Sequence, residues 1–150
     1  MIILDNKIIT DITDALEAQF LEQYPDLCVY DSDPELPEGF PCVSVVASDN
    51  ITLRSTREFG KATENHAIIT ITVNVYTNNA VGKKELGIAI FQVVDGILQN
   101  YNFTRLMASP MPNVDRSVAR FTGRYSAVVG APITQSIDGV ETLVYPVFRN

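Results

Sequence analysis

Hydrophobic residues follow a helical period in two parts of the chain. Ile12, Leu16, Phe20 and Tyr24 recur at every fourth position, which predicts an amphipathic helix over residues 11–24 that Pro25 ends. A second helix is predicted from Asn79, its expected N-cap, to Tyr101. The hydrophobic positions expected to face the core in this second helix are Leu86, Ala89, Ile90, Val93, Val94, Ile97 and Tyr101.

Strict alternation of hydrophobic and polar residues predicts strands elsewhere. It is clearest over residues 67–77 and 118–129, and shorter hydrophobic runs predict strands at 27–30, 42–47 and 103–108. Residues 109–113 carry two prolines and are expected to form a tight loop. Near the end of the chain, Asp138-Gly139 separates two strand-like runs, 133–137 and 140–145, which predicts a hairpin.

This order of elements predicts one α+β domain over residues 1–150. We expect a mainly antiparallel sheet with two helices packed on one face, plus a C-terminal β-hairpin within an extension over residues 131–150. Residues 48–66 are polar and too long for an ordinary connection, so they are expected to be a long loop or an extended arm. Neither a membrane span nor a signal peptide is recognisable, so we expect no membrane partner and synthesis in a cytoplasm.

Several residues are candidates for contacts with another subunit or partner. Ile88 and Phe91 lie off the predicted core stripe of the second helix, where either a partner or a loop of the same chain would cover them. Arg120 and Arg124 are expected on the strand face opposite Phe121 and Tyr125, where they could meet acidic residues of a neighbouring subunit. The polar segment adds three bases: Arg54, Arg57 and Lys61.

Charge is distributed unevenly along the sequence. The net charge is −7, with −10 in residues 1–50 and +3 in the remaining hundred. An acidic chain is poorly suited to gripping nucleic acid, because neutralising phosphates needs clustered Lys and Arg. The imbalance fits a complementary protein surface, a path that DNA follows without being held, or an acidic face that maintains solubility.

No residue pattern points to catalysis. His66 is the only histidine, and its place at the start of a strand favours a structural role. Cys28 and Cys42 lie in hydrophobic runs and are expected to be reduced core thiols rather than a disulfide. Nucleophile-elbow, zinc-binding, phosphate-loop and calcium-loop motifs are not found in the sequence. We therefore expect no enzymatic activity, no catalytic residue, no cofactor and no metal site.

A series of segments resembles bacteriophage tail-terminator or tail-completion proteins of the lambda-type group. In order, they are Asn65–Ala67, Val73–Asn78, Gly82–Lys84, Phe103–Arg105, Ser109–Asn113, Arg120 and Arg124–Val129. The resemblance covers roughly Phe40 to Val129, and its specificity lies in the order and spacing of the segments. The chain departs from the pattern after Gly130, where the C-terminal hairpin is longer than expected.

The resemblance implies a structural virion protein at the head-to-tail connection. Such a protein forms a homo-hexameric ring that caps the tail tube and joins it to the neck, and DNA passes through the channel without specific binding. Its implied partners are itself, the tail tube protein, a neck or head-completion protein and, in a contractile tail, the sheath protein. Two alternatives stay open: another head-tail connector of the same particle, and a small cytoplasmic enzyme or ligand-binding domain.

Overall fold

The computed structural model describes residues 2, 7–32, 34, 37–57, 60 and 64–149. The helices and strands follow one another in the predicted order. The structure adds a short 3-10 helix, η1, and a final strand, β8. The elements are α1 (Lys7–Phe20), β1 (Cys28–Tyr30), β2 (Cys42–Thr52), η1 (Arg54–Thr56), β3 (His66–Thr77), α2 (Lys83–Asn100), β4 (Thr104–Met111), β5 (Ala119–Gly130), β6 (Ile133–Ile137), β7 (Val140–Val144) and β8 (Val147–Arg149).

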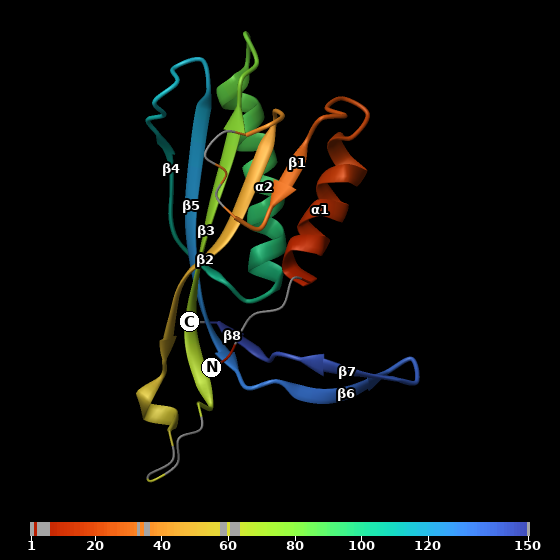
Figure 1. Ribbon diagram of the computed structural model, residues 1–150, viewed down its shortest axis with the longest axis vertical. Helices are drawn as coiled ribbons and strands as arrows, with labels where there is room; N and C mark the ends of the chain where they lie inside the picture. Colours follow the sequence, from red (N-terminus) through yellow and green to blue (C-terminus); the bar gives the residue numbers. More distant parts are fainter. Residues whose placement is uncertain are drawn as a thin grey trace.

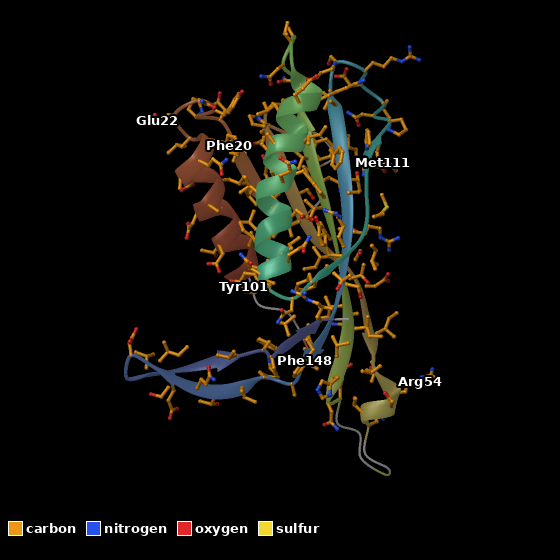
Figure 2. The ribbon with its side chains drawn as sticks, turned by 180° about the vertical axis from the view of Figure 1, so that it is seen from behind. Phe20, Glu22, Arg54, Tyr101, Met111 and Phe148 are labelled. Carbon is orange, nitrogen blue, oxygen red and sulfur yellow. The ribbon has the colours of Figure 1, made fainter. Side chains whose placement is uncertain are left out.

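One long, mainly antiparallel sheet organises the molecule (Figure 1). Its strand order is β1-β2-β3-β5-β4, β8 pairs with the last residues of β5, and only β1 and β2 run parallel. Both helices cover the same face of this sheet, as the two opposite views show (Figures 1 and 2). Strands β6 and β7 form a separate two-stranded sheet. The predicted α+β class, with helices on one face and a C-terminal hairpin, is therefore confirmed.

The core lies between the helices and the central strands. On β3, the alternation places Ile69, Ile71, Val73 and Val75 toward the helices, and all four are buried. The helices contribute the buried residues Ile8, Ile12, Leu16, Phe20, Ile90, Phe91, Val94 and Leu98. The opposite face of β3 and β5 is polar, as expected for a sheet covered on one side only.

The first helix begins earlier and ends earlier than predicted. It runs from Lys7 to Phe20, because Ile8 lies one turn before Ile12 and extends the same buried stripe. Tyr24 lies beyond the helix, yet its ring packs 6.4 Å from that of Phe20. The Tyr101 hydroxyl, at the end of α2, donates a hydrogen bond to the Asp11 carboxylate and ties the two helices together.

The second helix begins at Lys83 rather than at the predicted Asn79. Gly82 takes the N-cap position with φ +75°, a left-handed conformation that glycine adopts without strain. At the other end, Asn102 also has a positive φ, and the Phe103 amide donates to the Leu98 carbonyl at 3.0 Å. This arrangement closes the helix and turns Phe103 into the core.

Phe91 is a core residue packed against the sheet, so neither alternative left open by the sequence, cover by a partner or by a loop, was correct for it. Its side chain is only 4% exposed, whereas Ile88 is 42% exposed as predicted. The ring of Phe91 packs 4.7 Å from that of Phe121 and fills the space above Gly123, where an added Cβ would lie 2.6 Å from the Phe91 Cε2 atom. The gap above Gly123 in β5 lets α2 turn about its own axis so that Phe91 faces the sheet. The hydrophobic pattern of the helix alone does not contain this information.

The polar segment 48–66 begins and ends in strand and contains a short 3-10 helix, η1, between them. β2 continues to Thr52 with a bulge between Ala47 and Asp49, and its last residues pair with the beginning of β3. Together with η1 they form an arm that extends beyond the helices at one end of the sheet (Figure 1). The predicted strand at 42–47 was too short, because residues 48–52 are polar apart from Ile51 and lie in an exposed part of the sheet, so no hydrophobic pattern marks them as strand.

Two further boundaries differ from the prediction. Ser109–Met111, expected within a tight loop, belongs to β4 and pairs with Arg120–Thr122 of β5. β8 returns after the C-terminal hairpin to pair with Ala127–Val129. The hairpin turn itself agrees with the sequence, since Asp138 and Gly139 both have positive φ.

The packing of α2 predicts different costs for its two neighbouring hydrophobic residues. Phe91→Ala should lower the free energy of unfolding by about 3–5 kcal/mol, because it leaves a cavity over Gly123. Ile88→Ala, the matched control on the exposed side, should change it by less than about 1 kcal/mol. Urea unfolding of both variants measures this. Equal losses would show that α2 is not rotated as described.

Candidate functional site

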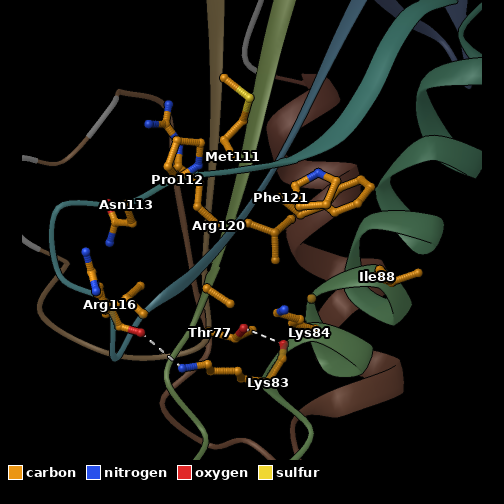
Figure 3. A pocket seen from close by; sticks show the side chains of 15 residues that line it. Thr77, Lys83, Lys84, Ile88, Met111, Pro112, Asn113, Arg116, Arg120 and Phe121 are labelled. Atoms are coloured by element: carbon orange, nitrogen blue, oxygen red, sulfur yellow. Dashed lines mark hydrogen bonds between the residues drawn. The ribbon is translucent and has the colours of Figure 1, made fainter.

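A pocket opens beside the N-terminal half of α2, on the side of the sheet edge formed by β4 (Figure 3). Its volume is about 540 Å³. Its wall is largely apolar and comes from α2, from the β4–β5 connection and from the ends of β3, β4 and β5. The lining residues are Val75, Thr77, Lys83, Lys84, Gly87, Ile88, Pro110, Met111, Pro112, Asn113, Arg116, Val118, Ala119, Arg120 and Phe121. We call it the α2–β5 pocket.

Local hydrogen bonds hold the wall of this pocket in place. The Thr77 hydroxyl donates to the Lys83 carbonyl at 2.6 Å, fixing the first turn of α2 to the end of β3. The Lys83 ammonium donates to the carbonyls of Arg116 and Ser117 at 3.2 and 3.3 Å (Figure 3). One lysine therefore closes the β4–β5 connection against the helix.

The α2–β5 pocket carries positive charge at its rim. Lys83, Lys84 and Arg116 line it, as does Arg120, although the Arg120 guanidinium turns to Asn74 and Tyr76 on the other face of the sheet. None of the lining residues, all of which the structure describes, is acidic. Asp115 lies next to the pocket but turns its carboxylate to Ser117, whose hydroxyl and amide donate at 2.7 and 2.9 Å. These two bonds hold the pKa of Asp115 below its usual value. A ligand of this pocket should be apolar with acidic groups at its edge.

The open face of the sheet holds the two predicted arginines. Arg120 is half-buried: its Nε donates to the Asn74 Oδ1 at 3.0 Å, and its guanidinium lies 5.7 Å from the centre of the Tyr76 ring. Arg124 is exposed and lies 3.8 Å from the Asp49 carboxylate. Both residues face away from Phe121 and Tyr125, as the strand alternation predicted. Within one chain, however, each already has a partner.

The arm formed by β2, η1 and β3 carries Arg54 and Arg57, both exposed and close to its end. Lys61, the third base expected there, lies outside the described residues. The arm is tied to the start of the chain, because the Asn50 side-chain amide donates to the Ile2 carbonyl. Glu64 accepts hydrogen bonds from the Thr52 hydroxyl at 2.7 Å and from the Ile2 amide at 2.6 Å. Both bonds, that of Thr52 first, hold the pKa of Glu64 below its usual value.

The C-terminal hairpin of β6 and β7 projects away from the main sheet on the side of α1 (Figure 1). Its root is fixed, because the Gly130 amide donates to the Pro146 carbonyl at 2.8 Å and the Ala131 amide to the Asn65 carbonyl at 2.9 Å. Every residue of β6 is exposed. An isolated two-stranded ribbon is only marginally stable in water, so this hairpin is suited to contact another surface.

A polar cluster under α2 serves the fold. Asp95 accepts hydrogen bonds from the Tyr125 hydroxyl at 2.6 Å, from Arg105 at 2.9 Å and from Gln99 at 3.0 Å. Burial and the bond to Asp95 raise the pKa of Tyr125 above its usual value. These bonds clamp α2 to β4 and β5.

The two cysteines and the histidine do not line the α2–β5 pocket; Cys42 is buried as expected, whereas Cys28 is only half-buried. Cys28 and Cys42 are register partners on β1 and β2, and no disulfide joins them. The ring of His66 packs 5.8 Å from that of Phe148 at the root of the hairpin. Among the described residues, no group of three or more potential ligands could hold a metal ion. Within the same part of the chain, no helix combines the length and apolarity needed to cross a membrane.

The structure brings together only some of the predicted contact residues. Ile88 and Arg120 line the same pocket, Arg54 and Arg57 share the arm, and Arg124 lies on the open face outside both. Lys84, Met111 and Arg116 complete the pocket but were missed as contact residues. The adjacent Lys83 and Lys84 in the predicted second helix could have indicated a basic contact surface at this place. Met111 was assigned to a turn, where an exposed hydrophobic residue is unremarkable.

The chain was compared with known proteins. No family model matches it, and no curated protein was found to be similar. Among solved structures, it is similar to that of the bacteriophage SPP1 gp17 protein, with 15% sequence identity and a TM-score of 0.38 over 79% of this chain and 87% of that chain. No residue is assigned a role from this similarity.

The two arginines of the open face should differ in their contribution to stability. Arg124→Ala removes one exposed ion pair and should cost less than about 1 kcal/mol. Arg120→Ala removes a bond to the buried Asn74 and the contact with Tyr76, and should cost about 1–2 kcal/mol. Urea unfolding of the single variants measures both, and a larger cost for Arg124→Ala would contradict the hydrogen bonding described.

The contribution of Glu64, which binds Thr52 and Ile2 at the arm, to the stability of the fold should depend on pH. Because its pKa is lowered in the folded chain, Glu64 stabilises the fold above its ordinary pKa, and this contribution is lost as the pH falls through the lowered value. We expect Glu64→Gln to destabilise the protein by less than about 1 kcal/mol at neutral pH, since the carboxylate is largely solvated. Thermal unfolding from pH 7 to pH 3 should show this difference vanish. Glu141→Gln, on the exposed hairpin, is the control and should show no such trend.

Proposed function

We propose that this protein is a structural subunit of a tailed bacteriophage that forms a ring where the tail meets the head. In this proposal six copies close a ring on the end of the tail tube, the neck docks on the other side of the ring, and DNA passes through the channel. The observation that carries the proposal is the opposite charge of the two edges of the sheet.

The edge formed by α1 and β1 is acidic. Residues 7–41, which run through α1 and β1 to the start of β2, contain nine acids and one base in the sequence. Asp14, Glu17, Glu22 and Asp26 are exposed there. Residues 83–120, which form α2, β4 and the start of β5 on the opposite edge, contain five bases and three acids.

Opposite charges on opposite edges favour a head-to-tail contact. In a two-fold contact each patch meets its own copy, which would bring like charges together. In a head-to-tail contact the acidic edge of one subunit meets the basic edge of the next, and such contacts generate a ring where the rotation closes. Acidic residues that remain exposed in the channel would repel phosphate and let DNA slide.

The segments that resemble tail-terminator proteins also belong together in space. They fall on β3, the start of α2, β4 and β5, which are neighbours in the fold. This unit includes the α2–β5 pocket. The resembling segments therefore support the proposal beside the charge of the two edges.

The proposal predicts where the protein binds on a tail. Purified protein should be added to purified tail tubes and the complexes imaged by electron microscopy, with portal complexes in a parallel mixture. We expect a ring at one end of each tube and no binding along the shaft. Binding along the shaft or no binding to tubes would contradict the assignment, and a ring on the portal alone would favour another head-tail connector.

A further inference from the structure

Most of the exposed large hydrophobic side chains in the described part of the chain lie at two distant places; Leu21, Ile51 and Leu106 lie elsewhere. One group surrounds the α2–β5 pocket and the adjoining turns: Val81, Ile88, Met111 and Val114. The other lies on the C-terminal hairpin and on β8: Ile133, Ile137, Val140 and Phe148. Met111 lies toward one end of the long axis and Phe148 toward the other (Figure 2). Exposed apolar clusters of this kind are unfavourable in water, so each cluster is suited to a contact with another surface.

The hairpin presents an apolar face with acidic residues at its tip. Ile137 and Val140 are opposite one another in the ladder, so their side chains lie on the same face beside the turn. Val140 is 64% exposed. Asp138 in the turn and Glu141, whose side chain lies on the other face of the ribbon from Val140, add two negative charges at the tip, and both are exposed. The tip of the hairpin is therefore apolar and acidic.

The α2–β5 pocket has the complementary character. Its apolar wall includes Ile88 and Met111, and its rim carries Lys84 and Arg116. The two surfaces lie on opposite edges of the same molecule, because the hairpin projects on the side of α1 whereas the pocket opens beside β4 (Figures 1 and 3). The hairpin of one chain therefore cannot reach its own pocket.

We propose that the C-terminal hairpin of one copy docks in the α2–β5 pocket of a second copy. Ile137 and Val140 enter the pocket and cover Ile88 and Met111. Asp138 and Glu141 lie at the rim beside Lys84 and Arg116. The contact joins unlike surfaces, so each subunit offers one hairpin and one pocket and the chain of contacts continues from copy to copy. This inference names the contact between neighbouring subunits of the proposed ring. It rests on the proposed function only because it requires copies of the chain to assemble.

Disulfide crosslinking between two populations of the full-length protein tests the contact. One population carries Val140→Cys and the other, isotope-labelled, carries Ile88→Cys. After mixing and mild oxidation, at high protein concentration and again on tail tubes, we expect a mixed disulfide between the two variants. Thr134→Cys, exposed on β6 nearer the root, replaces Val140→Cys in the matched control, and each cysteine variant mixed with unmodified protein measures any reaction of Cys28 or Cys42.

Charge reversal separates a specific contact from random collision. Adding Glu141→Lys to the hairpin population should lower the mixed disulfide about fivefold to tenfold, since like charges then meet at the rim. Adding Lys84→Glu to the pocket population should lower it similarly, and combining both reversals should restore it. A yield no greater than that of the Thr134→Cys control under either condition, or no rescue, would overturn the contact. A specific disulfide with no ring on tail tubes would uphold the contact and reject the proposed function instead.

Discussion

The packing of Phe91 against Gly123 is the contact on which the arrangement of the surface depends. The missing side chain in β5 leaves a gap over the sheet, and the Phe91 ring fills it beside Phe121 and Tyr125. This contact fixes the rotation of α2 about its own axis. Ile88, three residues before Phe91, lies roughly 60° away around the helix, at the border of the buried face, where it is exposed beside the pocket.

Two helices do not cover a sheet of this width. α1 packs on the β1 side and α2 mainly on β3 and β5, so most of β4 stays exposed beyond the place where Asp95 of α2 binds Arg105. The α2–β5 pocket forms at this boundary, where the core ends and the β4–β5 connection folds back toward α2. The same shortage of cover applies to the C-terminal hairpin, which leaves the main sheet between β5 and β8. The surfaces proposed for assembly are thus places where the fold of one chain ends without burying its apolar residues.

Charge reinforces this division of the surface. The acidic first part of the sequence folds onto one edge of the sheet, and the more basic middle part folds onto the other. Arg124 illustrates the limit of this separation, because Asp49 of the same chain lies within 3.8 Å of it. An exposed pair at this distance contributes little to stability.

The sequence alone determined the order of the elements, the class of the fold and the faces of the long strands. Strand alternation placed Arg120 and Arg124 correctly, and the Asp138-Gly139 turn predicted the hairpin, because both signals depend on local geometry. Tertiary structure decided the rotation of α2, the burial of Phe91 and the extension of β2 and β4 through polar or proline-containing residues. It also decided which residues share the pocket, because Lys84, Met111 and Arg120 come from three elements that only the packing brings together. The periodic pattern of a helix shows which of its residues are apolar. Which of these residues are buried depends also on gaps in the sheet, such as that at Gly123, and these belong to strands distant in sequence.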